Sequence, residues 1–494
     1  MWDIVRDATL GQVVNRLSHG KLFPYADQRP GYIIPERYLT KQQPSLGCNG
    51  SPTGSSDGVT LTDVDAVAPM DLEKSGSEKE QQPMEPYNPF LVTWDGPSDP
   101  DNPKNWSRGK KVAVAFLLCL LTCSVYIGSA IYTPSIPGLM EDFGVGTVVA
   151  TLGLSLFIFG YGISPIILTP LQDLAKFGRT PIYIICTFLF ALFQMPVLLA
   201  KNFETILIFR FFAGICSGPA MSTGGASMMD LYSPEFKAYA IATWAIGATA
   251  GPVLGPIAGG YAAQIKGWRW PIYELLWLSS FSLISLVLFL PETLGHTILH
   301  KRAARLRKLT GNQLLRSQSE IDEEGQAISK VLLGNVKRTF IVAGQPAVMF
   351  ANVYLGFAYG CFYTWFEGFP LVFGGIYGFG LGAQGLPFIG FVVAAIVTYV
   401  FYIFYQRIRM DPRAAKDPNF LPEERIEIAL VGAIIIPLSL LIFGWTSRTE
   451  VHWIVPVIAA SSYLGALFLL FQGLLMYLAN GYHNYAGPIL AGNK

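Results

Sequence analysis

The chain has 494 residues, of which 51% are hydrophobic and only 14% are charged, and its mean hydropathy is +0.40. Soluble domains carry about 25% charged residues, so this composition excludes a soluble enzyme and a disordered scaffold. The basic residues number 35 and the acidic residues 34, which leaves a net charge of +1 and indicates no nucleic-acid partner.

Residues 1–109 form a polar N-terminal region that we expect to be cytoplasmic and partly disordered. Within it, residues 2–17 place apolar side chains at near-helical spacing, which predicts an amphipathic helix lying on the membrane or on the protein itself. Residues 44–86 are rich in Ser, Asp, Glu, Gly and Pro, and we expect this stretch to be disordered. The chain starts with charged residues instead of a long apolar stretch, so no cleavable signal peptide is predicted.

Ten apolar runs follow from Val112 onward, each near the roughly 20 residues that cross a bilayer core as a helix. A strand barrel would instead show short segments of alternating hydrophobicity. The sequence therefore predicts an all-α membrane protein with about ten spans. The runs cover approximately residues 112–132, 147–169, 181–200, 204–229, 239–263, 271–290, 347–373, 383–405, 427–446 and 453–478.

Basic residues in the connections predict the orientation of the spans, because they concentrate on the cytoplasmic side of a membrane. The connections on the other side contain only Lys201, Lys266, Arg269 and Arg448, so the N-terminus is predicted to be cytoplasmic. A transporter built from repeated halves has this layout. We divide the chain into the N-terminal region 1–109, a six-helix bundle at 110–291, a cytoplasmic loop at 292–346 and an incomplete bundle of four spans at 347–494.

Between the second and third spans, Asp173, Gly178 and Arg179 lie in a short cytoplasmic turn. A carboxylate and a guanidinium at this place can join neighbouring helix ends in one state and release them in another. The alternative is a solvated turn with ordinary cytoplasmic charges.

Arg210 falls inside the fourth apolar run. A charge at membrane depth is costly and normally faces a cavity or a partner, although a long side chain can also extend toward an interface. We interpret Arg210 as a functional residue.

The fifth span carries glycines at four-residue spacing, two of which are followed by proline. Such spacing leaves one helix face without side chains, so another helix can approach closely, and the prolines remove backbone donors and bend the helix. On spacing alone, the pattern indicates a close-packed helix pair. The residues are Gly247, Gly251, Pro252, Gly255, Pro256 and Gly259.

In the seventh span, Tyr359, Tyr363 and Glu367 recur every four residues and form one polar aromatic stripe on an otherwise apolar helix. A desolvated carboxyl group can bind and release a proton near neutral pH. We therefore predict that Glu367 takes part in proton or substrate binding; the alternative is a glutamate at the outer rim.

The sequence contains no zinc-ligand spacing, no disulfide framework, no nucleotide-binding P-loop and no spacing that suggests a nucleophile–base pair. We therefore expect no enzymatic activity, no metal, no cofactor and no ATP-driven nucleotide domain.

Further motifs extend over almost the whole chain. They are Ile34–Leu39, Trp94–Pro97, Asn102–Trp106, Thr169–Pro170, Thr223–Ala226, Trp268–Trp270, Pro291–Thr293 and Phe366–Pro370. Together with the fifth-span pattern and the cytoplasmic turn, these stretches make the sequence resemble the fungal drug:proton antiporters of the major facilitator superfamily, especially their fluconazole- and benomyl-resistance branch.

The resemblance implies a major facilitator superfamily bundle that exports amphiphilic drugs, toxins or secondary metabolites across the plasma membrane by alternating access, with energy from a proton gradient. It implies that the antiporter motif of the family falls on the fifth-span glycines and prolines, and that its cytoplasmic gate falls on Asp173, Gly178 and Arg179. Arg210 corresponds to the arginine linked to proton transfer, and we pair it with Glu367 as the proton-coupling residues.

The substrate cavity is expected between spans 1, 4, 7 and 10, with Tyr126, Tyr359, Tyr363 and Gln472 as its residues. Expected partners are small amphiphilic substrates, protons and the lipid bilayer. Members of the family have twelve spans, whereas this sequence stops at Lys494, so we expect an incomplete second bundle. Two alternatives stay open: an uncoupled facilitator or importer of a small molecule, and a transport-dead truncated membrane protein.

Overall fold

The computed structural model describes residues 2–18, 20–28, 31–32, 34–39, 90–324, 326–416 and 420–481. The stretch 44–86, which was predicted to be disordered, and residues 482–494 at the end of the chain lie outside these ranges. The part that the structure describes is built from helices, with two isolated β-bridges that join Ala8 to Pro291 and Leu91 to Arg316.

The first half of the protein is a bundle of six long helices, which we call the N-half. Their order along the chain agrees with the six apolar runs predicted between Val112 and residue 290. They are α4 (Arg108–Ala130), α6 (Thr147–Gln172), α7 (Arg179–Leu198), α8 (Phe203–Leu231), α9 (Lys237–Lys266) and α10 (Trp270–Phe289), with the short α5 (Ile136–Phe143) after α4.

In the second half, which we call the C-half, the described residues form four long helices. They are α14 (Pro346–Phe369), which continues as a π-helical segment over Pro370–Ile376, α15 (Ile389–Tyr405), α17 (Glu427–Thr446) and α18 (Ile454–Gly481). Within the described residues, nine helices are long and apolar enough to cross a membrane, and α13 (Ile328–Ala343) with α14, bent by 84°, raises the number to ten. The ten predicted spans therefore agree with the upper count.

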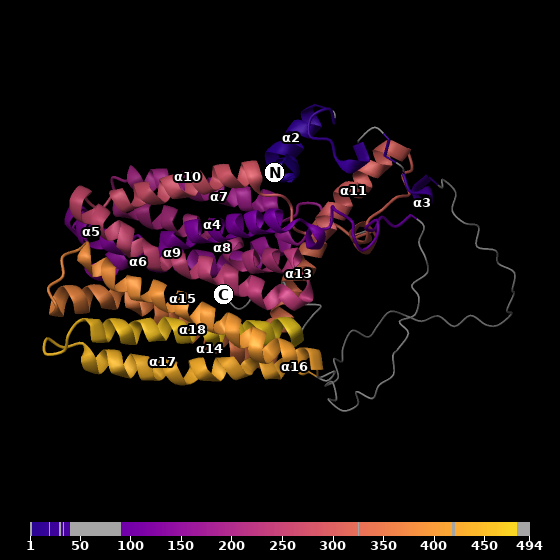
Figure 1. Ribbon diagram of the computed structural model, residues 1–494. Coiled ribbons are helices and arrows are strands. Elements are labelled where there is room, and N and C mark those ends of the chain that lie inside the picture. Colours follow the sequence, from indigo (N-terminus) through magenta and orange to yellow (C-terminus); the bar gives the residue numbers. More distant parts are fainter. Residues whose placement is uncertain are drawn as a thin grey trace, which may run out of the picture.

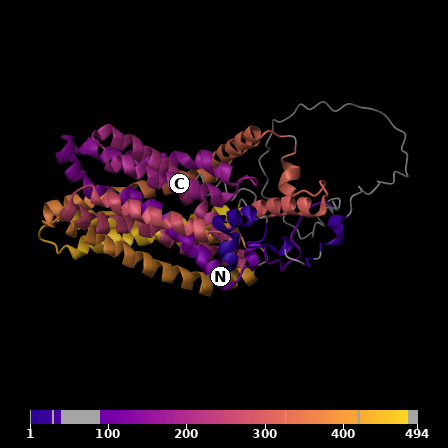
Figure 2. The same ribbon diagram turned by 90° about the horizontal axis from the view of Figure 1, so that it is seen from above.

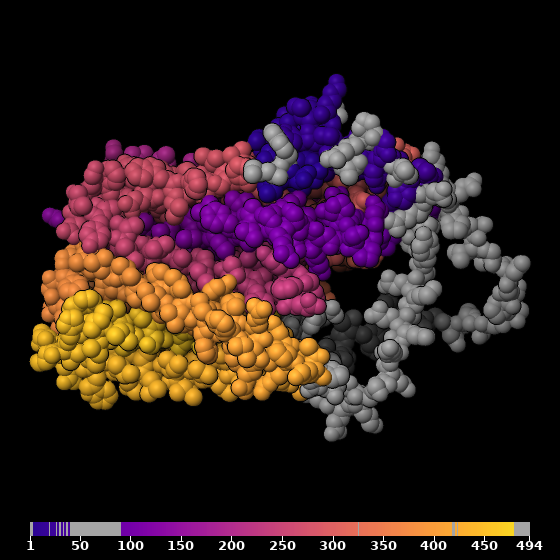
Figure 3. Space-filling model, in the orientation of Figure 1, coloured from indigo at the N-terminus to yellow at the C-terminus, as the bar shows by residue number. Residues whose placement is uncertain are grey.

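The two halves lie side by side, with their long helices running in roughly the same direction (Figures 1 and 2). Figure 3 shows the orange and yellow C-half along one flank of the purple and pink N-half. Helix α9 makes much of the contact between the halves, because it packs against α15 and against the short helix at Ala383–Phe388. The elements outside the bundle gather at one end, which we predict to be cytoplasmic.

The N-terminal segment differs from the single helix predicted over residues 2–17. It forms two helices, α1 (Trp2–Asp7) and α2 (Thr9–Leu17), because the backbone is extended at Ala8, where it pairs with Pro291. The two helices cross at Gly11, where a Cβ atom would lie 2.0 Å from the carbonyl oxygen of Val5. Both helices contact α10, which agrees with the predicted location on the protein itself.

The segment before α4 is joined to α11 (Gly295–Thr310), the first helix of the central loop, by a buried ion pair. Arg302 on α11 donates to Asp99 over 2.6 Å and also contacts Asp95. The side chains of Arg302 and Asp99 are both nearly inaccessible to solvent. The central loop also contains α12 (Gln318–Asp322).

Replacing Asp99 with Asn is expected to destabilise this cytoplasmic region by about 3–5 kcal/mol at neutral pH, because it leaves Arg302 buried without its main counter-charge. Although burial opposes the shift, the backbone N–H of Asp95 and the Arg302 guanidinium hold the pKa of Asp99 below its usual value. The stabilisation is therefore present above the ordinary aspartate pKa of about 3.9 and is lost as the pH falls through the lowered value.

Protease sensitivity of the α11 region, followed from neutral to acidic pH in the purified protein, checks this expectation. Asp322→Asn, at an exposed position in the same loop, is the matched control and should leave the sensitivity unchanged. An Asp99→Asn protein as resistant as the wild type at neutral pH would contradict it.

Candidate functional site

A small cavity of about 90 Å³ lies between the two halves, near the middle of the long helices. Tyr126 lines it from α4, Trp244 and Pro252 from α9, Tyr359 from α14 and Gln472 from α18. These helices are spans 1, 5, 7 and 10. The cavity was expected between spans 1, 4, 7 and 10, so span 5 lines it where span 4 was expected. Drug-sized sites occupy roughly 300–1,000 Å³, so the halves must move apart to admit a substrate.

The fifth span replaces the fourth at this cavity because of its glycine stripe, which faces α4. A Cβ atom on Gly251 would lie 2.8 Å from the carbonyl oxygen of Cys123, and one on Gly255 would lie 2.7 Å from the backbone nitrogen of Ile131. Gly247 and Gly259 also face α4, with Cys119 and Ile131 respectively. This close approach brings Pro252 to the cavity wall.

Pro256, the second proline of the motif, lies further along α9, where its carbonyl oxygen would be 2.4 Å from a Cβ on Gly385. The glycines of the motif therefore form the face of α9 that contacts α4, while Pro256 contacts the C-half. The predicted close packing agrees with the structure. Pro252 and Pro256 both lie inside α9, and the bend expected from them stays a prediction.

Gly255→Ala is expected to lower transport at least tenfold, because the added methyl group meets backbone atoms of α4 that cannot rotate away. Gly356→Ala on α14 is the matched control, since nothing lies within 4 Å of a Cβ at that position. Dye efflux from cells that contain equal amounts of the two variants provides the measurement. Equal efflux by both would show that the contact with α4 tolerates a side chain.

Of the four predicted cavity residues, Tyr126, Tyr359 and Gln472 line the cavity and Tyr363 lies beside it. The rings of Tyr359 and Tyr363 are 5.2 Å apart, and the Tyr363 hydroxyl is 3.2 Å from that of Ser129 on α4. Tyr359 and Tyr363 pack against the hydrophobic clusters of both halves. The aromatic stripe of α14 thus lies at the junction between the two bundles.

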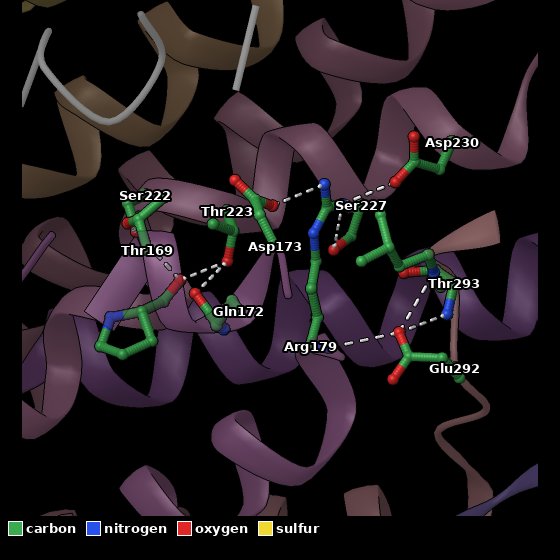
Figure 4. A network of polar contacts seen from close by, with 12 residues as sticks. Thr169, Gln172, Asp173, Arg179, Ser222, Thr223, Ser227, Asp230, Glu292 and Thr293 are labelled. Carbon is green, nitrogen blue, oxygen red and sulfur yellow. Dashed lines mark hydrogen bonds and ion pairs between the residues drawn. The ribbon is translucent and has the colours of Figure 1, made fainter. Parts of the chain in front are cut away.

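At the cytoplasmic end of the N-half, Arg179 joins the ends of three helices (Figure 4). Its guanidinium lies 2.6 Å from the carboxylate of Asp230 at the end of α8 and 3.5 Å from that of Asp173 after α6. It also donates to the Ser227 hydroxyl over 3.2 Å. Arg179 is buried, so the structure places it in a polar network and not in the solvated turn that was the alternative.

The same network includes Glu292, which follows α10. Its carboxylate accepts the backbone N–H groups of Arg179 and Thr180 at the start of α7, over 3.3 and 3.2 Å. A carboxylate at a helix N-terminus satisfies unpaired donors and is favoured by the helix dipole. Gly178 has a φ of +77°, and a Cβ there would lie 2.4 Å from Glu292 Oε2. Glycine at this position therefore allows the cap to form.

The cytoplasmic ends of the two halves are in contact beyond this network. Met229 of α8 and Ile241 of α9 belong to one buried cluster with Leu475 and Met476 of α18. In this conformation the central cavity is therefore covered on its cytoplasmic side.

Arg210 lies inside the N-half and does not line the central cavity. Its guanidinium donates to the carbonyl oxygens of Gly128 on α4, over 2.7 Å, and Gly153 on α6, over 3.2 Å. Its charge also lies 4.4 Å from the ring centre of Tyr132 and 4.7 Å from that of Phe157. Arg210 is 0% exposed and its Nη2 atom has no hydrogen-bond partner, which excludes the interface position considered as an alternative.

Glu367 lies away from Tyr359 and Tyr363, at a second cavity of about 490 Å³ toward the outer end of the bundle. Thr133 and Gln384 also line this cavity. The Oε1 atom of Glu367 is buried and has no hydrogen-bond partner. The two predicted proton-coupling residues therefore lie at different places. Tyr132, whose ring contacts the Arg210 guanidinium, is next in the chain to Thr133 of the Glu367 cavity.

Three residues of these sites were missed by the sequence reasoning. Asp230 falls at the end of an apolar run, and nothing in that run distinguishes it from an ordinary terminal charge. Glu292 belongs to a motif that was noticed without a role, and Tyr132 is the last residue of the first predicted span. A search for carboxylates at the cytoplasmic ends of the spans would have found the first two.

Comparison with known proteins places this architecture among transporters. The profile of the Major Facilitator Superfamily matches residues 118–489. "Transporter mfs1" of Schizosaccharomyces pombe is 40% identical over 409 residues, which cover 82% of this chain and 76% of that protein. "Fluconazole resistance protein 1" of Saccharomyces cerevisiae is 41% identical over 425 residues, which cover 86% and 76%.

"Cycloheximide resistance protein" of Candida maltosa is 34% identical over 497 residues, which cover 99% of this chain and 88% of that protein. Among solved structures, the xylose transporter XylE of Escherichia coli, in a partially occluded inward-open conformation, matches with a TM-score of 0.53 and 14% identity, over 78% of this chain and 88% of that one. This last similarity concerns the fold alone.

Proposed function

The chain belongs to the Major Facilitator Superfamily of transporters, and we propose that it exports small amphiphilic molecules across the plasma membrane in exchange for protons. Relatives named for resistance to fluconazole and cycloheximide support export of drug-like compounds. The aromatic and apolar walls of the central cavity suit amphiphilic substrates.

The observation that most supports proton coupling is the burial of the Arg210 charge inside the N-half. A charge that is fully buried, has one unpaired nitrogen and is held by backbone carbonyls is costly in a membrane protein. Proteins keep such energetically unfavourable groups mainly at functional sites. There, a change in a nearby charge can shift the equilibrium between two arrangements of the helices.

The proposed cycle uses the two cavities in turn. Substrate enters the central cavity from the cytoplasm when the contact between Met229, Ile241 and α18 opens. The cytoplasmic end then closes through the same contact, while the Arg179 network holds the helix ends of the N-half together, and the substrate leaves toward the outer cavity. A proton that binds at Glu367 from the outside favours the return of the empty protein.

The available energy is sufficient for resistance. One proton that crosses a potential of 100 mV supplies about 2.3 kcal/mol, and a difference of one pH unit adds about 1.4 kcal/mol. The sum of about 3.7 kcal/mol sustains a several-hundred-fold concentration gradient of a neutral substrate at one proton per molecule.

Expression in a yeast host that lacks its own drug pumps tests the proposal. We expect increased growth in fluconazole or cycloheximide and faster loss of a preloaded amphiphilic dye, compared with cells carrying an empty vector. Correct insertion is checked with a fluorescent C-terminal fusion at the plasma membrane. If the protein is inserted there while drug sensitivity and dye retention stay unchanged, the proposal is wrong and the transport-dead alternative gains support.

A further inference from the structure

The central cavity contains one polar side chain that the protein does not satisfy. Gln472 on α18 is 0% exposed and lines this cavity. Neither its Oε1 nor its Nε2 atom has a hydrogen-bond partner. Buried amide groups are nearly always hydrogen-bonded in folded proteins, so an amide with both functions unpaired at a cavity wall indicates a place for a ligand.

Two other polar groups of the cavity wall have partners within the protein. The Thr249 hydroxyl donates to the carbonyl oxygen of Ala245, and Trp244 Nε1 donates to the Thr122 hydroxyl over 3.0 Å. Among the described lining residues, Gln472 is the one whose buried donor and buried acceptor both lack a hydrogen-bond partner.

The remaining surface of the cavity is apolar and aromatic, and none of its described lining residues carries a formal charge. A charged substrate would lose its hydration there without gaining a counter-ion. Aromatic faces do attract cations, but these rings pack on one another: Tyr359 lies 5.8 Å from Phe362 and 6.0 Å from Phe471. The wall therefore favours flat, neutral molecules.

We propose that the central cavity selects neutral aromatic compounds that carry an amide-type group, with an N–H donor beside a C=O acceptor, and that Gln472 is the residue that recognises this group. The class includes primary and secondary amides, lactams and imides. The Gln472 carbonyl accepts from the ligand N–H while its NH₂ group donates to the ligand C=O, so that one side chain makes two parallel hydrogen bonds. This inference rests on the proposed export function, whose substrate class it specifies.

Two probes of nearly equal size separate hydrogen bonding from burial of apolar surface. 1-Naphthamide offers both a donor and an acceptor, whereas methyl 1-naphthoate has the same ring and an acceptor but no donor. We expect the full-length protein in lipid nanodiscs to bind 1-naphthamide about tenfold more tightly than the ester, because the ester leaves the Gln472 carbonyl unpaired. Equilibrium binding with radiolabelled probes provides the measurement.

Gln472→Leu should remove this preference, with amide binding falling about tenfold and ester binding unchanged. The variant is expected to fold, because the side chain that it removes makes no hydrogen bond in the folded protein. Gln194→Leu is the matched control: Gln194 is also 0% exposed, but it lies on α7 and does not line the cavity. The control should keep the tenfold preference.

Three results would overturn the inference: equal binding of the amide and the ester by the wild type, a preference that survives in Gln472→Leu, or tighter binding of the cation trimethyl(1-naphthyl)ammonium than of the amide. Each of them leaves export of other compounds intact. Conversely, unchanged dye retention in cells combined with a tenfold amide preference in nanodiscs would contradict the export function while keeping the recognition by Gln472.

Discussion

Arg210→Ala is expected to abolish concentrative export while downhill movement of the same dye continues. In the proposed cycle, the variant removes the buried charge that couples protonation to the change of conformation, but it leaves the walls of both cavities in place. We expect the dye gradient that energised cells maintain to fall about 100-fold, close to equilibrium, because the several-hundred-fold gradient depends entirely on coupling.

This prediction is tested by measuring the dye gradient in energised cells and the downhill dye flux in de-energised cells. Arg210→Lys retains a positive charge but cannot reproduce both guanidinium contacts, to Gly128 and Gly153, in their fixed geometry, so we expect an intermediate gradient. Arg269→Ala, which removes a half-exposed arginine at the outer end of α10, is the control and should leave export unchanged. Equal loss of uphill and downhill transport in Arg210→Ala would remove the coupling role and favour an uncoupled facilitator.

Arg179→Ala is expected to reduce export at least tenfold by separating the ends of α6, α7 and α8. The change leaves the carboxylates of Asp173 and Asp230 close together without the guanidinium between them. Removing one partner from a buried ionic network typically destabilises the arrangement by about 3–5 kcal/mol. Because this network holds the cytoplasmic ends of the N-half, the variant should spend less time with that side closed.

A second substitution distinguishes a local charge effect from general unfolding. Arg179→Ala combined with Asp230→Asn removes one of the two unpaired carboxylates, so we expect it to recover part of the lost efflux. Lys176→Ala, an exposed lysine in the same turn, should behave like the wild type. Initial rates of dye efflux, normalised to protein at the cell surface, are the measurement. A double variant that is worse than Arg179→Ala would show that the carboxylates do not act through Arg179.

The helical architecture was predictable because the bilayer imposes it. A backbone in lipid must satisfy its hydrogen bonds within each segment, so apolar runs of the right length become spanning helices whatever their detailed sequence. The glycine spacing of the fifth span similarly predicted that another helix packs closely against it, although only the structure identifies that helix as α4.

Contacts between distant segments were not predictable from the local pattern. Arg179 meets Asp230 and Glu292, which lie 51 and 113 residues further along the chain, and no periodicity connects them. The same limit applies to the central cavity, where α9 takes the place expected of α8. Helix rotation about its own axis depends on packing with all neighbours, and the sequence of one helix does not contain that information.

The break between α1 and α2 has a related origin. Apolar spacing alone favours one continuous helix, but the extended Ala8 backbone gains a partner at Pro291, far away in the sequence. Tertiary pairing therefore overrides a weak local preference for helix.

Proton flux driven by substrate tests the central claim most directly. The purified protein is placed in liposomes that enclose a pH-sensitive dye, and a gradient of 1-naphthamide is imposed across the membrane without any initial pH difference. The account predicts that protons move in the direction opposite to the amide, and that Arg210→Ala abolishes this proton movement while the amide still equilibrates. Transport of the amide by the wild-type protein with no accompanying change in internal pH would contradict it.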